Sequence, residues 1–365
     1  MTERVAWTML IAGGGTGGHL FPALAVAEEF RDRNQANSVH FLGTRRGMEA
    51  RVIPRLGYPL HFIDVEGLKG KNPLLIMRAA VKIPGSIMQS LAILKSLRPD
   101  IVLGVGGYAA GPVVLAAALA GITTAIQEQN VAPGLTNRLL GHVARRVFLS
   151  FDESVRWFQE KKVVVTGNPV RREICNVRTI RKSSREPSTV FVFGGSQGSA
   201  AINRTVIEAL PYMIDRKRAI RFIHQTGAAD RKILVEAYKK SEIAADVHEF
   251  INDMREVYDR ADIVVCRAGA TSIAEITALG KASILIPYPY AAGNHQAINA
   301  RMLADDRAAV MIEEKDLTGR DLAAAIMGLI DDGETRLLME EHSYRRGRRD
   351  ATRRIVDELM ELAKQ

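Results

Sequence analysis

Two glycine-rich turns about 180 residues apart constrain the fold of this chain more than any other feature. The first turn, Gly13–Gly18, follows the apolar run Trp7–Ala12, and the second, Gly194–Gly198, follows Val190–Phe193. A helix-forming segment, Ala200–Leu210, comes after the second turn, and a similar one comes after the first. Strand, glycine turn and helix are the opening unit of a parallel α/β sheet, and the offset is too long for a solenoid repeat. We therefore expect two similar Rossmann-like domains facing each other across a cleft.

The chain length of 365 residues also favours two domains, at roughly 150 residues each. We expect a first domain over residues 1–168, a second over 169–340, and a C-terminal helix within 341–365 that packs back on the first domain. The first helix is expected to open near Pro22, because proline suits a first helical turn. Further short apolar runs predict strands at 39–42, 101–103, 123–126, 146–149, 221–225, 247–250, 263–266 and 283–287.

Composition excludes several other classes. With 47% hydrophobic and 25% charged residues, the chain is not mainly disordered. Cys175 and Cys266 lie far apart, which argues against a disulfide framework or a zinc site. The uncharged stretch 101–127 is long enough to span a bilayer, but five glycines and Pro112 interrupt it. It is predicted to be a buried strand, loop, helix and strand, and the short run Val5–Ala12 a strand rather than a signal peptide.

The formal net charge of +9 is unevenly distributed. Residues 45–98 hold ten basic and three acidic side chains, whereas residues 171–365 are almost balanced. A local basic surface indicates an anionic partner, which composition alone leaves open as nucleic acid, an anionic membrane or a phosphorylated substrate.

The glycine turns suit an anion such as phosphate or pyrophosphate, because backbone N–H groups and a helix N-terminus converge on such a loop. The first turn is not followed by Lys-Ser or Lys-Thr, so it is not a Walker A loop. It also lacks a GxGxxG placement with an acidic residue about 20 positions later, which counts against a nicotinamide site.

Individual polar residues next to these turns are candidates for substrate contacts. His19 ends the first turn, where the partial positive charge of a helix N-terminus favours a neutral imidazole that can accept a proton. Glu275 follows a Gly-Ala-Thr-Ser turn, and a carboxylate there can hold two ribose hydroxyls. Asn130 and Gln296 follow predicted strands, and their amides suit sugar hydroxyls or an acetamido group.

Six motifs in order resemble one family. They are Gly14-Gly15-Thr16-Gly17-Gly18-His19-Leu20-Phe21-Pro22, Gly104-Val105-Gly106-Gly107-Tyr108, Glu128-Gln129-Asn130, Gly167-Asn168-Pro169-Val170-Arg171, Gly194-Gly195-Ser196-Gln197-Gly198, and Cys266-Arg267-Ala268-Gly269 with Glu275. Together they resemble the MurG family, the UDP-N-acetylglucosamine–N-acetylmuramyl-(pentapeptide) pyrophosphoryl-undecaprenol N-acetylglucosamine transferases of peptidoglycan synthesis. The resemblance runs from about residue 8 to about residue 310.

The resemblance implies an α/β chain with a GT-B fold and an inverting transfer of N-acetylglucosamine to the muramyl 4-hydroxyl of lipid I, which gives lipid II. It implies no cofactor and no metal. The first domain would bind the acceptor and the second the donor, UDP-N-acetylglucosamine. The implied donor contacts are Thr16, Gly17, Gly18, Asn130, Arg171, Ser196, Ile251, Ala270, Thr271, Ser272, Ile273, Ala274, Glu275 and Gln296. His295 stands where some members have glutamine, which puts that one sugar contact in doubt.

On the acceptor side, His19 is the candidate base for the acceptor hydroxyl, and Gly104, Gly106, Gly107 and Tyr108 are candidates for its pyrophosphate. Because the acceptor carries a long lipid, we expect the enzyme to work as a peripheral protein at the cytoplasmic face of the bacterial cell membrane. The mixed apolar and basic segment 68–83, with Lys69, Lys71, Arg78 and Lys82, is predicted to meet an anionic membrane surface. A buried amphipathic helix is the alternative for this segment.

Three other functions remain open from the residues alone. A redox Rossmann enzyme would need a nicotinamide site, which the loop pattern disfavours. A UDP-sugar 2-epimerase shares the two-domain plan but needs no basic and apolar surface. A nucleic-acid-binding module would use the arginines of 345–354, but acidic residues interleave with them and no aromatic stacking set accompanies them, so we expect no nucleic acid partner.

Overall fold

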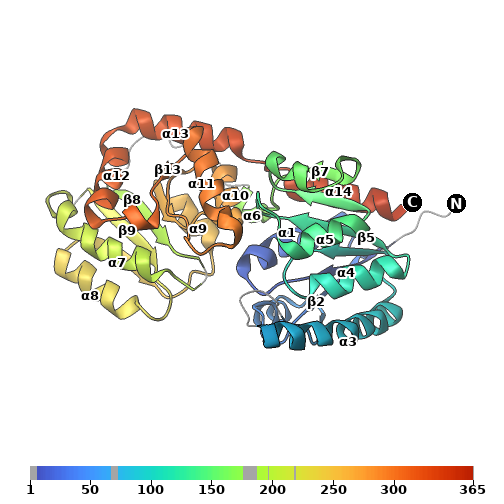
Figure 1. Ribbon diagram of the computed structural model, residues 1–365. Helices are drawn as coiled ribbons and strands as arrows, with labels where there is room; N and C mark the ends of the chain where they lie inside the picture. Colours follow the sequence, from blue (N-terminus) through green and yellow to red (C-terminus); the bar gives the residue numbers. More distant parts are fainter. Residues whose placement is uncertain (1–5, 67–72, 176–186, 196, 218, 365) are drawn as a thin grey trace. The chain divides into compact units, whose positions relative to one another are not determined.

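The computed structural model describes residues 6–66, 73–175, 187–195, 197–217 and 219–364 (Figure 1). The chain divides into two compact units. Unit 1 comprises residues 1–171 together with 349–365, and unit 2 comprises residues 172–348. Each unit holds one parallel β-sheet with its own helices, so the prediction of two Rossmann-like α/β domains is confirmed.

The described residues of unit 1 form a seven-stranded sheet in the order β3-β2-β1-β4-β5-β6-β7, in which every neighbouring pair is parallel. The strands are β1 (Thr8–Ala12), β2 (Ser38–Gly43), β3 (Leu60–Phe62), β4 (Ile101–Gly104), β5 (Thr123–Glu128), β6 (Arg146–Leu149) and β7 (Val163–Val165). The helices are α1 (Gly17–Arg33), α2 (Glu49–Val52), α3 (Pro73–Leu97), α4 (Ala110–Leu119), α5 (Leu135–Val143) and α14 (Ala351–Lys364).

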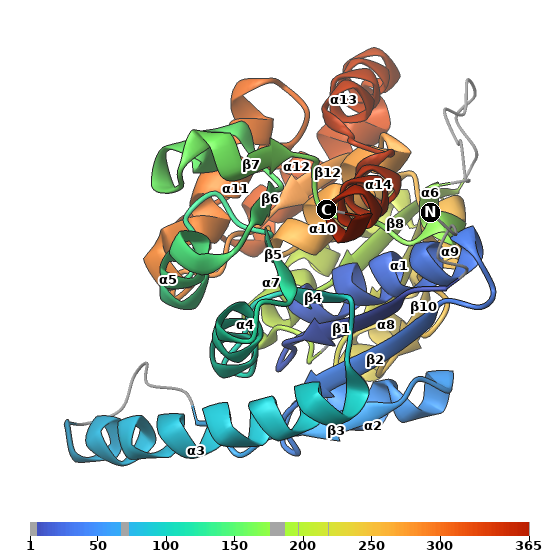
Figure 2. The ribbon, with the colours of Figure 1, turned by 90° about the vertical axis from the view of Figure 1, so that its right-hand side faces the viewer.

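Alternation along the strands of unit 1 builds two cores, one on each face of the sheet. Met9 and Ile11 of β1 point to the face covered by α1 and α14, whereas Leu10 and Ala12 point to the face covered by α3, α4 and α5. Successive strand side chains point to opposite faces, so a strand covered on both sides is apolar throughout. The C-terminal helix α14 contributes Ile355 to the first of these cores and lies beside α1 in Figure 2.

The described residues of unit 2 form a six-stranded parallel sheet in the order β10-β9-β8-β11-β12-β13. Its strands are β8 (Ser188–Phe193), β9 (Ile220–Gln225), β10 (Ala244–His248), β11 (Ile263–Cys266), β12 (Ala282–Leu285) and β13 (Val310–Met311). Its helices are α6 (Arg172–Cys175), α7 (Ala200–Ala209), α8 (Arg231–Ser241), α9 (Met254–Arg260), α10 (Ala270–Leu279), α11 (His295–Asp305), α12 (Gly319–Asp331) and α13 (Gly333–Arg346).

Two sequence predictions about local structure were wrong. Helix α1 begins at Gly17, so Pro22 lies inside the helix instead of opening it. The extended backbone of Thr16 provides the N-cap, which places His19 in the first helical turn. The strand expected at 247–250 is β10, Ala244–His248, whose partly exposed side chains give only a weak apolar signal. Within the described residues, no helix combines the length and apolar character needed to cross a bilayer.

Candidate functional site

The predicted motifs surround the point in each sheet where the strand order reverses. In unit 1 this point lies between β1 and β4, which are followed by the Gly13–Thr16 turn and the Val105–Ala109 loop. In unit 2 it lies between β8 and β11, which are followed by the second glycine turn and by Arg267–Gly269. Parallel α/β sheets bind ligands beyond the carboxyl ends of the strands at such switch points.

The two glycine loops of unit 1 pack backbone against backbone. The N–H of Gly14 donates to the carbonyl of Gly106 over 3.4 Å. A Cβ atom on Gly13 would stand 2.3 Å from that same carbonyl oxygen, and one on Gly107 would stand 2.6 Å from the oxygen of Gly14. All four residues also have positive φ. The structure therefore brings together the first loop and the candidate acceptor-pyrophosphate loop, with glycine required by both contact and conformation.

The imidazole of His19 is oriented by the first loop. Its Nδ1 lies 3.2 Å from the carbonyl oxygen of Gly14 and 3.4 Å from Thr16 Oγ1. A carbonyl only accepts, so in the neutral ring this contact places the proton on Nδ1 and leaves Nε2 as the basic nitrogen. A Cβ on Gly106 would lie 3.0 Å from Nε2, so the basic edge of the ring stands beside the second loop. This geometry suits a proton acceptor.

At the end of β5, Asn130 is held by the buried carboxylate of Glu128, which lies in the same motif but was not predicted to be a site residue. Glu128 Oε1 accepts from the backbone N–H of Asn130 at 2.9 Å and from its Nδ2 at 3.2 Å. Its Oε2 accepts from Asn137 Nδ2 and from Gly134 N. Burial raises the pKa of Glu128, and the four hydrogen bonds act in the opposite direction. The Asn130 side chain is thus fixed through its nitrogen.

Two other predicted residues of unit 1 lie close to these loops. The guanidinium of Arg171 lies 5.3 Å from the centroid of the Phe21 ring, one turn beyond the N-terminus of α1. Tyr108 is 54% exposed, next to Gly107, which is a high exposure for a large aromatic side chain.

In unit 2, the N-terminus of α10 is capped by Gly269, whose extended backbone offers no capping side chain. The predicted contacts Ala270, Thr271 and Ser272 form the first turn, where the positive end of the helix dipole favours an anion. Glu275 is one turn further and only 6% exposed. Its Oε2 accepts a 3.0 Å hydrogen bond from the hydroxyl of the buried Tyr258, which fixes the direction of the carboxylate.

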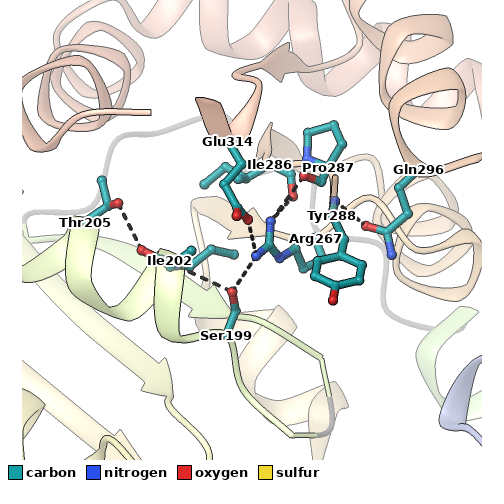
Figure 3. Close-up of polar contacts among 10 residues, drawn as sticks. Ser199, Ile202, Thr205, Arg267, Ile286, Pro287, Tyr288, Gln296 and Glu314 are labelled. Carbon is teal, nitrogen blue, oxygen red and sulfur yellow. Dashed lines mark hydrogen bonds and ion pairs between the residues drawn. The ribbon is translucent and has the colours of Figure 1, made fainter. Parts of the chain in front are cut away.

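Arg267, in the Cys266-Arg267-Ala268-Gly269 motif, was not predicted to be a functional group. Its Nη1 donates to the carbonyls of Ile286 and Pro287 at 3.2 Å, and its Nη2 donates to Ser199 Oγ at 2.8 Å (Figure 3). It also forms a 2.5 Å ion pair with Glu314. One guanidinium therefore joins three loops at the carboxyl edge of this sheet. No local sequence pattern predicts this role, because the partners of Arg267 are far apart in sequence.

Two further predicted contacts of unit 2, Gln296 and Ile251, are bonded to the protein itself. Gln296 Oε1 accepts from the backbone N–H of Tyr288 at 2.9 Å (Figure 3), which leaves its amide nitrogen directed elsewhere. The N–H of Ile251 donates to Gln225 Oε1 at 2.8 Å, and Gln225 Nε2 donates to Gly195 O. The predicted contact Ser196 lies outside the described residues. Among the residues that are described, no group of three or more His, Cys, Asp or Glu side chains could hold a metal ion.

Residues 9–149 match the N-terminal domain of glycosyltransferase family 28, and residues 189–355 match the C-terminal domain of the same family. The UDP-N-acetylglucosamine–N-acetylmuramyl-(pentapeptide) pyrophosphoryl-undecaprenol N-acetylglucosamine transferase of Syntrophus aciditrophicus is 49% identical over 362 residues, which cover 99% of both chains. This chain belongs to the MurG family.

The crystal structure of MurG from Acinetobacter baumannii supports the same family, with a TM-score of 0.77, 31% identity, and coverage of 97% of this chain and 99% of that one. The predicted GT-B fold is therefore confirmed. A UDP-N-acetylglucosamine 2-epimerase also aligns, with a TM-score of 0.66 over 98% of this chain and 96% of its own, but it is only 13% identical. That similarity concerns the fold alone, so the MurG family assignment disfavours the epimerase alternative.

Proposed function

We propose that this chain transfers N-acetylglucosamine from UDP-N-acetylglucosamine to the muramyl 4-hydroxyl of lipid I, with inversion at the sugar, to give lipid II. Membership of the MurG family over nearly the whole chain is the observation that carries this proposal. The site adds physical support, because glycine loops and helix N-termini surround both sheet switch points, as a reaction between two pyrophosphate-bearing substrates requires.

The nucleotide part of the donor is bound by unit 2 in this proposal. The first turn of α10 faces the negative charge that develops on the departing UDP, and Glu275, whose carboxylate Tyr258 orients, holds the ribose. Because the N–H of Ile251 is already bonded to Gln225, the uracil edge meets the carbonyl oxygen of Ile251. The amide nitrogen of Gln296 donates to sugar hydroxyls.

The acceptor reaction is assigned to unit 1. Nε2 of His19 takes the proton from the 4-hydroxyl as that oxygen attacks the anomeric carbon, while Nδ1 stays bonded to Gly14. The Gly106–Gly107 loop, with Tyr108 exposed beside it, receives the acceptor pyrophosphate through backbone N–H groups. Asn130, which is fixed through its nitrogen, offers Oδ1 to the acetamido N–H of the donor sugar.

We further propose that unit 1 meets the membrane at the cytoplasmic face, through the layer of α3, α4 and α5. Leu135, Leu139 and Val143 recur every four residues along α5 and are 67%, 61% and 40% exposed. Leu119 at the end of α4 is 73% exposed and Met88 of α3 is 71% exposed. An apolar stripe of this kind, beside cations such as Arg138, suits insertion at an anionic lipid surface.

The segment originally expected to make this contact is only partly described. Lys69 and Lys71 lie outside the described residues, as does the side chain of Arg78. Lys82 is described, and its Nζ pairs with Glu66 at 2.8 Å and with Asp64 at 3.3 Å. Two carboxylates offset its charge, so the membrane proposal relies on α5 more than on Lys82.

Incubation of the purified chain with labelled UDP-N-acetylglucosamine and a lipid I analogue tests the proposed function. We expect the label to appear in a disaccharide lipid with a β-1,4 bond. Release of free N-acetylglucosamine, or formation of the 2-epimer without transfer, would contradict the proposal. Omission of the lipid analogue is the control, because the labelled donor should then stay intact.

A further inference from the structure

Glu49 is a buried carboxylate that none of the assignments above uses. It opens the short helix α2 and is only 2% exposed. Its Oε2 accepts from the N–H of Gly15 at 2.7 Å, and its Oε1 accepts from Thr44 N at 2.9 Å and from Thr44 Oγ1 at 3.1 Å. Both carboxylate oxygens thus accept from donors, and one of these donors lies in the first glycine loop.

Glycines line the space that this carboxylate fills. A Cβ on Gly14, Gly43 or Gly47 would come within 2.5, 2.5 or 2.0 Å of the Glu49 side chain. Gly43 and Gly47 are absent from the residues with positive φ, so backbone conformation does not demand glycine there. At Gly43 and Gly47 the reason for glycine is steric, because any Cβ there would collide with the Glu49 carboxylate. Several glycines are therefore needed to accommodate this one side chain.

The bond from Gly15 connects Glu49 to His19 through a single peptide group. The N–H of Gly15 and the carbonyl of Gly14 belong to the same planar unit, and in a trans peptide they point in opposite directions. Glu49 holds the N–H side at 2.7 Å, and His19 Nδ1 contacts the carbonyl side at 3.2 Å. A charged acceptor on the N–H polarises the peptide, which makes its carbonyl a better acceptor for the imidazole.

We propose that Glu49 is a positioning residue that orients the His19 imidazole through the Gly14–Gly15 peptide, so that Nε2 is the basic nitrogen presented to the acceptor hydroxyl. Gly13, Gly14 and Gly15 all have positive φ. Because glycine has more backbone conformations available than other residues, fixing this loop costs more conformational entropy than fixing an ordinary one. The carboxylate fixes the one peptide on which the tautomer and direction of His19 depend. This inference rests on the proposed function only where it concerns turnover.

Glutamine is the sharpest substitution because it keeps the shape of the side chain and changes one oxygen into a donor. In either orientation of a Glu49→Gln amide, its nitrogen faces the N–H of Gly15 or of Thr44, and one of the two loses its acceptor. Glu29→Gln is the matched control, since it makes the same charge change on α1 of the same unit and weakens an exposed pair with Arg33.

The test measures three quantities: kcat, the affinity for UDP, and the tautomer of the His19 imidazole by ¹⁵N NMR. For Glu49→Gln we expect kcat to fall on the order of 10- to 100-fold, a part of what a general base contributes. UDP affinity should stay within about twofold of the parent chain, because UDP is assigned to unit 2. The ¹⁵N spectrum of His19 should change from the Nδ1–H tautomer to a mixture, and Glu29→Gln should match the parent in all three measurements.

An unchanged His19 tautomer, or an unchanged kcat in a chain that transfers sugar, would overturn the proposal. The tautomer is measured without substrate, so a shifted tautomer in a chain that transfers no sugar supports the positioning role while the proposed function fails. If Glu49→Gln does not fold, Gly47→Ala decides, because its methyl group displaces the carboxylate without removing the charge. It should produce the same tautomer mixture and the same fall in kcat.

Discussion

The guanidinium of Arg267 donates to the hydroxyl of Ser199 over 2.8 Å, across a sequence separation of 68 residues. Ser199 is the N-cap of α7 and follows the second glycine turn, and Arg267 directly follows β11. The bond therefore joins the two loops on either side of the switch point in unit 2. We expect the shape of the proposed nucleotide site to depend on this connection.

Replacing Arg267 should weaken UDP binding more than it weakens folding. Arg267→Lys keeps the charge but cannot reach Ser199, two carbonyls and Glu314 together, because an ammonium lacks the planar fork. We expect UDP affinity, measured by calorimetry, to fall about tenfold or more, as the loss of one or two charged hydrogen bonds implies. Arg260→Lys, a surface pair with Asp246, is the control and should bind UDP normally. Normal UDP affinity in Arg267→Lys would contradict the proposal that Arg267 holds these loops in the shape that binds UDP.

His19→Gln should separate chemistry from donor binding. Glutamine can still bond Gly14 but provides no basic nitrogen, so we expect kcat to fall roughly 100- to 10,000-fold with UDP affinity unchanged. Steady-state kinetics at saturating acceptor checks the first expectation and calorimetry the second. A variant that kept near-parental kcat would exclude His19 as the base.

Charge placed on the α5 stripe should weaken attachment to membranes. We expect Leu135→Glu combined with Leu139→Glu to reduce co-sedimentation with anionic vesicles severalfold, because a carboxylate in the lipid interface costs free energy and is repelled by anionic headgroups. Transfer to a water-soluble acceptor analogue should persist. Ile233→Glu serves as the control at an equally exposed site of unit 2, and equal loss in both variants would count against α5.

We expect Glu340 to make the stability of unit 2 depend on pH. Burial raises the pKa of its carboxyl to about 7, although Arg336 and Lys281 lower it and Asp262 raises it further. The unfolded chain releases this proton near pH 4.5 and the folded chain near pH 7, so the stabilisation by the protonated carboxyl is present below about pH 4.5 and is lost as pH rises to about 7. Glu340→Gln should remove that loss, and the gain in Tm over the parent should be larger at pH 8 than at pH 5. An equal gain in Tm at pH 5 and pH 8 would contradict this expectation.

The parts of the fold set by local patterns were predictable. Apolar runs followed by glycine turns located β1, β4, β8 and β11, because buried parallel strands are apolar on both faces. The three-residue strands β3 and β7 and the two-residue β13 are too short to show a period. Their position depends on pairing with a sheet that is already formed.

Within the site, residues at loop ends were predictable and residues that act on those loops were not. Thr16, His19 and Asn130 lie where a strand-and-turn pattern places them. Glu49 and Arg267 act through partners that are distant in sequence, and a single acidic or basic residue has no pattern that distinguishes it from a solvated one. Only the folded structure shows that each of these two side chains makes several hydrogen bonds.

Helix α14 has a consequence for how the chain is made. It packs on α1 and places Ile355, Val356 and Leu359 in the core of unit 1, so that unit is built from two segments of the chain that flank unit 2. During synthesis the second unit is complete before residue 349 emerges, whereas the core of the first still lacks one of its helices. We therefore expect part of the α1 face of unit 1 to stay exposed until residues 351–364 have been synthesised.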